Sequence, residues 1–136
     1  MKFPSIDYSK ATVAGLVGTV AMSLSCSISI PKLGIEASNS IQLLTHIFWN
    51  NQDFGWISHV TIGIILAIIY AAIQKSISGP PIIRGILFSL LPWALFQIVI
   101  LPLLGFPCFM DSLQGASTSF IRHCIYGAIL GGMYGK

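Results

Sequence analysis

Charged side chains are scarce in this sequence. Of its 136 residues, four are acidic and seven are Lys or Arg, so that 8% of the chain is charged while 54% is hydrophobic. A water-soluble domain carries roughly 25% charged residues, because its surface must be hydrated. The scarcity of charge therefore excludes an ordinary soluble domain and indicates an integral membrane protein.

The chain also lacks the patterns that accompany most known chemistries. Its net charge of +3 is scattered, with no basic patch that would follow nucleic acid. Its three cysteines include no C-x-x-C pair, so neither a disulfide framework nor a zinc ribbon is predicted. There is no nucleophile elbow, H-E-x-x-H motif or phosphate loop. We therefore predict no catalytic residue and no metal centre, and expect that the protein is not an enzyme.

Four apolar stretches account for most of the chain. A helix needs about 20 apolar residues to cross the hydrocarbon core of a bilayer. The predicted helices cover residues 11–30, 56–74, 84–104 and 117–135. A shorter segment at about 40–51 is predicted to be a helix lying in the membrane interface. The predicted fold class is an all-α membrane protein, with residues 1–136 forming a single four-helix transmembrane domain.

The second and fourth apolar stretches repeat one pattern 64 positions apart. Residues 57–71 read ISHVTIGIILAIIYA, and residues 121–135 read IRHCIYGAILGGMYG. The first and third stretches each end in P-x-L-G, at 31–34 and 102–105. We interpret the chain as a duplicated two-helix hairpin. Because two helices return the chain to its starting side, the halves are expected to be parallel repeats.

Small residues follow each repeated histidine at intervals of four. On a helix this spacing forms a smooth ridge. Helices in a membrane associate through such ridges, because close backbone approach takes the place of a hydrophobic driving force. The ridges would pack helices of this chain together, or one ridge would face another subunit. The predicted helix-packing residues are Gly63, Ala67, Ala71, Gly127, Gly131 and Gly135.

Basic residues are unevenly shared between the two ends of the predicted helices. Toward one end lie Lys2, Lys10, Lys75, Arg84 and Lys136, and toward the other lie only Lys32 and Arg122. The positive-inside rule therefore places both termini in the cytoplasm.

Several motifs together resemble a known family. They are A-G-L-V-G-T at 14–19, P-K-L-G at 31–34, G-W-I-S-H-V-T-I-G at 55–63, R-G-I-L-F at 84–88, P-L-L-G at 102–105 and H-C-I-Y-G-A-I-L-G-G-M-Y-G at 123–135. This set resembles a family of small four-helix prokaryotic integral membrane proteins of unknown function. The resemblance implies the architecture and a place in the prokaryotic cytoplasmic (inner) membrane. It supplies no chemistry.

The repeated histidines are the strongest candidates for chemistry, because ionisable side chains inside a membrane are costly and mark functional sites. Facing each other across a pseudo-twofold axis, His59 and His123 would ligate a b-type haem, with Arg122 meeting a propionate. Alternatively, the same two histidines would bind a quinone. In the alternative without a ligand, each histidine hydrogen-bonds a neighbouring helix, as Gln97 is expected to do.

Three functions follow, in order of preference. The first is a non-catalytic accessory or scaffold subunit of a larger membrane complex, surrounded by the lipid bilayer and held by partner subunits or as a homo-oligomer. The second is an electron-transfer module that binds haem or quinone through His59 and His123. The third is a small transporter or channel, which is disfavoured because no Asp or Glu lies inside a predicted helix. Nucleic acid is not an expected partner.

Overall fold

The structure is a computed structural model that describes residues 5–25, 40–47 and 50–135. Every regular element in these ranges is helical, as predicted. The long helices are α1 (Tyr8–Ser25), α3 (Gln52–Ile73), α4 (Pro81–Leu95) and α6 (Leu113–Tyr134). The shorter elements are α2 (Ser40–Ile47), η2 (Gln74–Ser76), the π-helical turn η3 (Phe96–Ile100), α5 (Leu101–Leu103) and η4 (Cys108–Asp111).

Two helical stretches in the described ranges, Gln52–Ser76 and Pro81–Leu103, are long and apolar enough to cross a membrane. The described helices begin three or four residues before the predicted ones. Polar caps extend two of them beyond the apolar runs: the Asn51 side chain accepts hydrogen bonds from two backbone N–H groups of α3, and Ser112 accepts one in α6. Helix α4 instead begins with Pro81 in its first turn, a position that proline favours. Residues 26–30 of the first predicted helix and 48–49 of the interfacial one lie outside the described residues.

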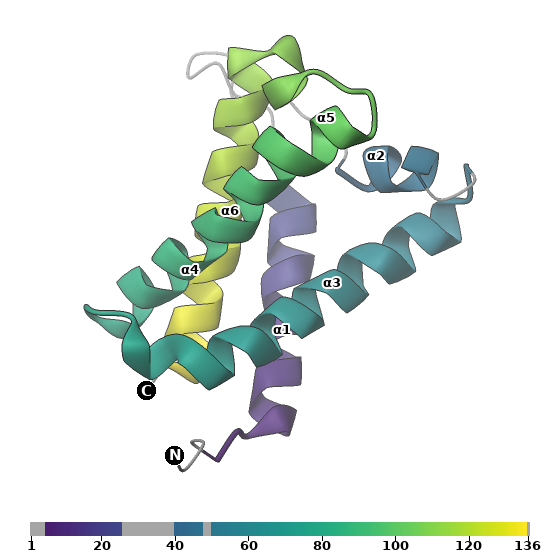
Figure 1. The fold of residues 1–136 in the computed structure, drawn as a ribbon. Helices are drawn as coiled ribbons and strands as arrows, with labels where there is room; N and C mark the ends of the chain where they lie inside the picture. Colours follow the sequence, from purple (N-terminus) through teal and green to yellow (C-terminus); the bar gives the residue numbers. More distant parts are fainter. Residues whose placement is uncertain (1–4, 26–39, 48–49, 136) are drawn as a thin grey trace.

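The long helices are arranged around α1 and α6, which lie side by side (Figure 1). Helix α3 packs against α1, and α4 packs against α6. Helices α3 and α4 meet near the turn that joins them and diverge toward α2 and α5 (Figure 1). Helix α2 packs on α3.

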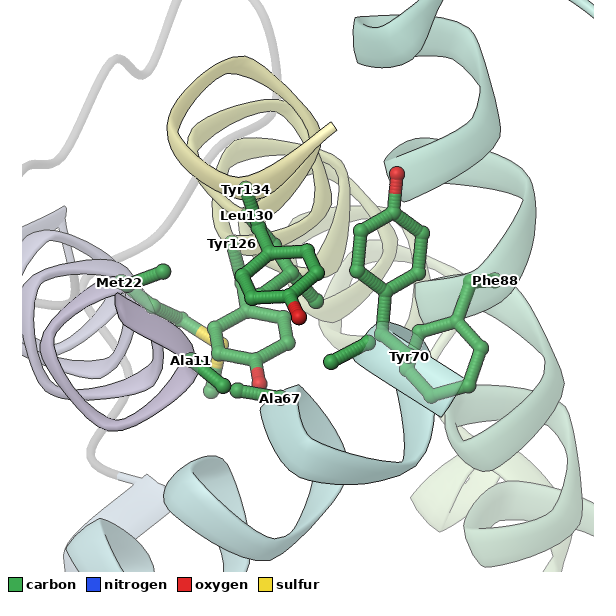
Figure 2. Close-up of a cluster of buried hydrophobic side chains, with 10 residues drawn as sticks. Ala11, Met22, Ala67, Tyr70, Phe88, Tyr126, Leu130 and Tyr134 are labelled. Atoms are coloured by element: carbon green, nitrogen blue, oxygen red, sulfur yellow. The ribbon is translucent and has the colours of Figure 1, made fainter. Parts of the chain in front are cut away.

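The core combines aromatic rings with very small residues (Figure 2). The Tyr70 ring lies 5.3 Å from that of Phe88 and 6.5 Å from that of Tyr134, measured between centroids. Leu130 and Ala67 are fully buried beside them. Rings from α3, α4 and α6 thus fill the end of the bundle where α3 and α4 converge.

Arg84 joins two helix ends at this side of the bundle. Its guanidinium donates to the backbone carbonyl and the side-chain oxygen of Gln74 (3.2 and 2.9 Å), directly after α3. It also donates to the carbonyl of Gly135 at the end of α6 (3.1 Å). Carbonyls at a helix C-terminus lack partners within the helix and carry partial negative charge, so a cation there is stabilising.

The motif Pro102-Leu-Leu-Gly105 ends the helical run that begins at α4. Gly105 has a φ of +84°, a left-handed conformation that glycine adopts without steric penalty. Its N–H donates to the carbonyl of Pro102, and the next N–H, of Phe106, donates to that of Leu101. These bonds satisfy carbonyls left free at the helix end. The matching motif at 31–34 lies outside the described residues.

Candidate functional site

The first small-residue ridge faces α1. A Cβ atom on Gly63 would overlap the Thr19 hydroxyl, and a Cβ on Gly15 would lie 2.8 Å from that of Ala67 and 2.9 Å from the carbonyl oxygen of Gly63. Ala71, the last residue of this ridge, is buried. Helices α1 and α3 therefore approach each other with almost no side chain between them.

The second ridge faces α4 in the same way. A Cβ on Gly85 would overlap the carbonyl of Gly127, and one on Gly131 would overlap that of Pro81. A Cβ on Gly135 would lie 2.9 Å from Cβ of Pro81. The Ser89 hydroxyl donates to the carbonyl of His123 across this contact (2.8 Å). Both ridges are thus used to pack helices of this chain, and neither is left for another subunit.

Corresponding residues make the two contacts. Gly15 and Gly85 are 70 positions apart, and so are Thr19 and Ser89, whereas the two P-x-L-G motifs are 71 apart. The segment from Ser89 to Pro102 is therefore one residue longer than the matching segment from Thr19 to Pro31. The π-helical turn η3 lies in that interval, and such a turn contains one residue more than the α-helix around it.

The two halves differ in how the first helix of each half, α1 or α4, contacts the other half. At Gly18 of α1, a Cβ would lie 2.9 Å from the Tyr126 ring of α6, so glycine allows close contact. The Tyr126 hydroxyl continues past it to donate to the carbonyl of Gly63 (2.6 Å). Phe88 occupies the position in α4 that matches Gly18. Its ring packs against that of Tyr70 on α3, so that two aromatic rings lie between α4 and α3.

The repeated histidines lie on α3 and α6. His59 is 8% exposed, and its Nε2 is buried without a hydrogen-bond partner. His123, on α6, is partly buried. Nδ1 of His123 is 2.9 Å from the carbonyl oxygen of Ser119. A carbonyl only accepts, so this nitrogen carries the hydrogen, and Nε2 of the neutral ring presents a lone pair.

Ser119 also forms hydrogen bonds with polar side chains of α4 and η3. Its hydroxyl oxygen lies 3.2 Å from Nε1 of Trp93 and 3.3 Å from Nε2 of Gln97, both of which donate to it. The predicted interhelical bond of Gln97 is confirmed. Gln97 is 7% exposed, and its Oε1 is buried without a partner. No sequence pattern singles out Ser119, although it stands one helical turn before His123.

Arg122 is 3% exposed on α6. Adjacent residues on a helix point about 100° apart, so Arg122 and His123 face different sides. The positions of these two residues therefore do not support a direct contact between Arg122 and a group bound by His123. Among the residues that the structure describes, no three His, Cys, Asp or Glu side chains form a metal-binding group.

An open groove lies where η4 meets the first turns of α6. Its lining is largely apolar and consists of Trp93, Phe109, Ser112, Leu113, Ala116, Ser117, Phe120 and Ile121. Leu113 projects from the start of α6 and is 86% exposed. Trp93 thus lines this groove and also donates to Ser119.

Comparison with known proteins gives one match. A family model described as "Family of unknown function (DUF6789)" matches residues 6–136. Neither a curated protein nor a solved structure matches the chain. The match covers every helix described above, and it agrees with the predicted membership of a family of unknown function. The chain belongs to the DUF6789 family.

Proposed function

We propose that this chain is a four-span membrane protein of two parallel hairpin repeats, with both termini in the cytoplasm. The observation that supports it is the outward surface of α1, α3 and α4, which carries large aliphatic side chains from end to end. Examples at least 40% exposed are Val13, Leu24, Ile57, Ile65, Ile69, Leu87, Leu91 and Leu95. Soluble monomers rarely expose an apolar surface of this extent to water, whereas lipid solvates such a surface.

The four long helices also suit a bilayer in length. At 1.5 Å per residue, α1 and α6 measure about 27 and 33 Å over their 18 and 22 residues, close to the roughly 30 Å of a hydrocarbon core. Helix α6 is the least apolar of them, and it packs between α1 and α4, where it needs little lipid contact.

Within the membrane we propose a non-catalytic role as an accessory or scaffold subunit. Since both small-residue ridges pack inside the chain, the partner would bind elsewhere. The groove beside η4 is the best candidate surface, because it is apolar, concave and rimmed by the exposed Leu113. Two aromatic side chains line it, the partly buried Trp93 and the exposed Phe120, and aromatic residues are enriched in binding hot spots.

Site-specific photocrosslinking in native membranes tests this role. A photoreactive amino acid at Leu113 is expected to give one protein adduct of defined mass, because the groove would hold a partner. The same probe at Ile65, on the aliphatic face of α3, serves as the matched control and should give lipid adducts. Lipid adducts alone at both positions would contradict the subunit role.

A second candidate function, electron transfer through haem, has support from the two histidines. A histidine that ligates a metal usually donates its other ring N–H to a carbonyl or carboxylate, as His123 does to Ser119. The unpartnered Nε2 of His59 is equally suited to a ligand role. Haem bound there would supply one-electron chemistry, and the protein would provide two neutral nitrogen ligands in an apolar interior.

An oxidised-minus-reduced visible spectrum of the gently extracted protein tests this candidate. The haem reading predicts a Soret band with sharp α and β bands that disappear in His59→Ala and in His123→Ala. A flat spectrum from the wild-type protein, with both variants still folded, would eliminate haem and leave the histidines as packing residues.

A further inference from the structure

The polar group around Ser119 includes acceptor atoms that packing alone does not require. We propose that Gln97 and His123, positioned by Ser119, bind the head group of a quinol dissolved in the membrane. This proposal rests on the four-span arrangement proposed above. It does not depend on the subunit role or on haem.

Ser119 holds the two binding side chains next to each other. Its hydroxyl oxygen accepts from the Gln97 amide at 3.3 Å, and its carbonyl oxygen accepts from Nδ1 of His123 at 2.9 Å. The amide and the imidazole are thus each one hydrogen bond from the same residue. Trp93, which also donates to the Ser119 hydroxyl, places an indole beside them.

Both groups present acceptors. Oε1 of Gln97 is buried and has no donor, and Nε2 of a neutral His123 ring carries a lone pair because Nδ1 has the hydrogen. A buried acceptor without a donor, such as Oε1 of Gln97, is rare in folded proteins and calls for an explanation. The complementary ligand carries hydroxyl donors. The Nε2 atom of His59, on α3, is a further buried polar atom without a partner.

The π-helical turn explains how Gln97 reaches this position. In an uninterrupted α-helix, Gln97 would point about 120° away from Gly85, whose side of α4 contacts α6. The residue added in η3 turns the chain, so that Gln97 and the following Leu101 are both buried. π-Helical turns occur frequently at functional sites.

The position of the site determines the ligand class. In the proposed arrangement, Gln97 lies within a transmembrane helix, so the ligand arrives through lipid and must be apolar apart from its head group. A quinol meets this requirement, because its flat ring carries two hydroxyl groups and an isoprenoid tail. The oxidised quinone has only acceptors, which would oppose Gln97 Oε1 and His123 Nε2. The site is therefore selective for the reduced form.

Fluorescence of Trp93 in the full-length protein tests the proposal. With Trp49 and Trp56 replaced by Phe, the protein in lipid nanodiscs is titrated with decylubiquinol and, separately, with decylubiquinone. We expect saturable quenching, with the quinol binding at least fivefold more tightly. Gln97→Leu should weaken quinol binding at least tenfold, whereas the matched control Gln52→Leu, at an exposed position in the first turn of α3, should leave it unchanged.

Three results would overturn the proposal: quenching that rises linearly in every variant, saturable binding unaffected by Gln97→Leu, or tighter binding of the quinone. If Gln97→Leu fails to fold, as judged by far-UV circular dichroism, Ser119→Ala carries the same expectation, because it removes a single oxygen atom. Crosslinking at Leu113 would be unaffected by either variant, so a failure of this site is distinguishable from a failure of the proposed function.

Discussion

Replacing Gly131 with Ala is expected to lower the free energy of unfolding by roughly 3 kcal/mol, at the upper end of the usual effect of overpacking. The added methyl group would overlap the backbone carbonyl of Pro81 and lie 3.0 Å from Cα of Ile82. Backbone atoms cannot rotate away as a side chain can, so α4 and α6 would have to separate along their shared ridge. Unfolding of the purified protein in mixed micelles, titrated with SDS, measures this change.

The neighbouring residue provides a matched control. A Cβ on Gly132 would meet only Cγ1 of the Ile82 side chain, at 3.9 Å, which is ordinary contact. Gly132→Ala should therefore raise stability by up to about 1 kcal/mol, because alanine favours the helix over glycine. Equal effects at Gly131 and Gly132 would show that α4 and α6 do not pack through this ridge.

Replacing Arg84 with Met is expected to destabilise the protein by about 3 kcal/mol, since hydrogen bonds to charged groups contribute roughly 1.5–3 kcal/mol each and their losses overlap. The substitution keeps most of the side-chain volume but frees the carbonyl groups of Gln74 and Gly135, at the ends of α3 and α6. The same SDS titration measures the loss.

Two further substitutions separate charge from geometry at this position. Arg84→Lys keeps the charge but has a single nitrogen, which cannot reach both helix ends as a planar guanidinium does. It should recover less than half of the stability lost in Arg84→Met. Lys75→Met removes an exposed charge nearby and should have little effect. A fully stable Arg84→Lys protein would mean that charge alone is required.

The sequence predicted the helical class and the small-residue ridges, because both follow from periodicity within one segment. The spacing of Gly63, Ala67 and Ala71 indicates a smooth face wherever the helix packs. The spacing does not indicate which helix packs against this face. That α1 does so follows only from the structure, in which Gly15 lies against Ala67. Similarly, the exchange of Gly18 for Phe88 makes the two halves unequal, although each residue alone suits an apolar helix.

The polar group was only partly predictable. His59 and His123 were identified from their repetition, and Gln97 from its polarity within an apolar stretch. Ser119 was not, because a serine is common in membrane helices and its importance comes from contacts with two other elements. The π-helical turn corresponds to a change in the repeat spacing from 70 to 71 residues. This change can be interpreted only when the matching contacts of the two halves are known.

The central claim is that α4 crosses the membrane within a four-span protein, and cysteine accessibility tests it most directly. Cys108 is exposed beyond the far end of α4, and Ser78, exposed in the turn before α4, can be replaced with Cys in a separate variant. Both proteins would carry Cys26→Ser and Cys124→Ser, and the Ser78→Cys protein also Cys108→Ser. A membrane-impermeant maleimide is expected to label Cys108 in intact cells, and the cysteine at position 78 only after permeabilisation. Labelling of both positions from the same side would contradict a membrane-spanning α4.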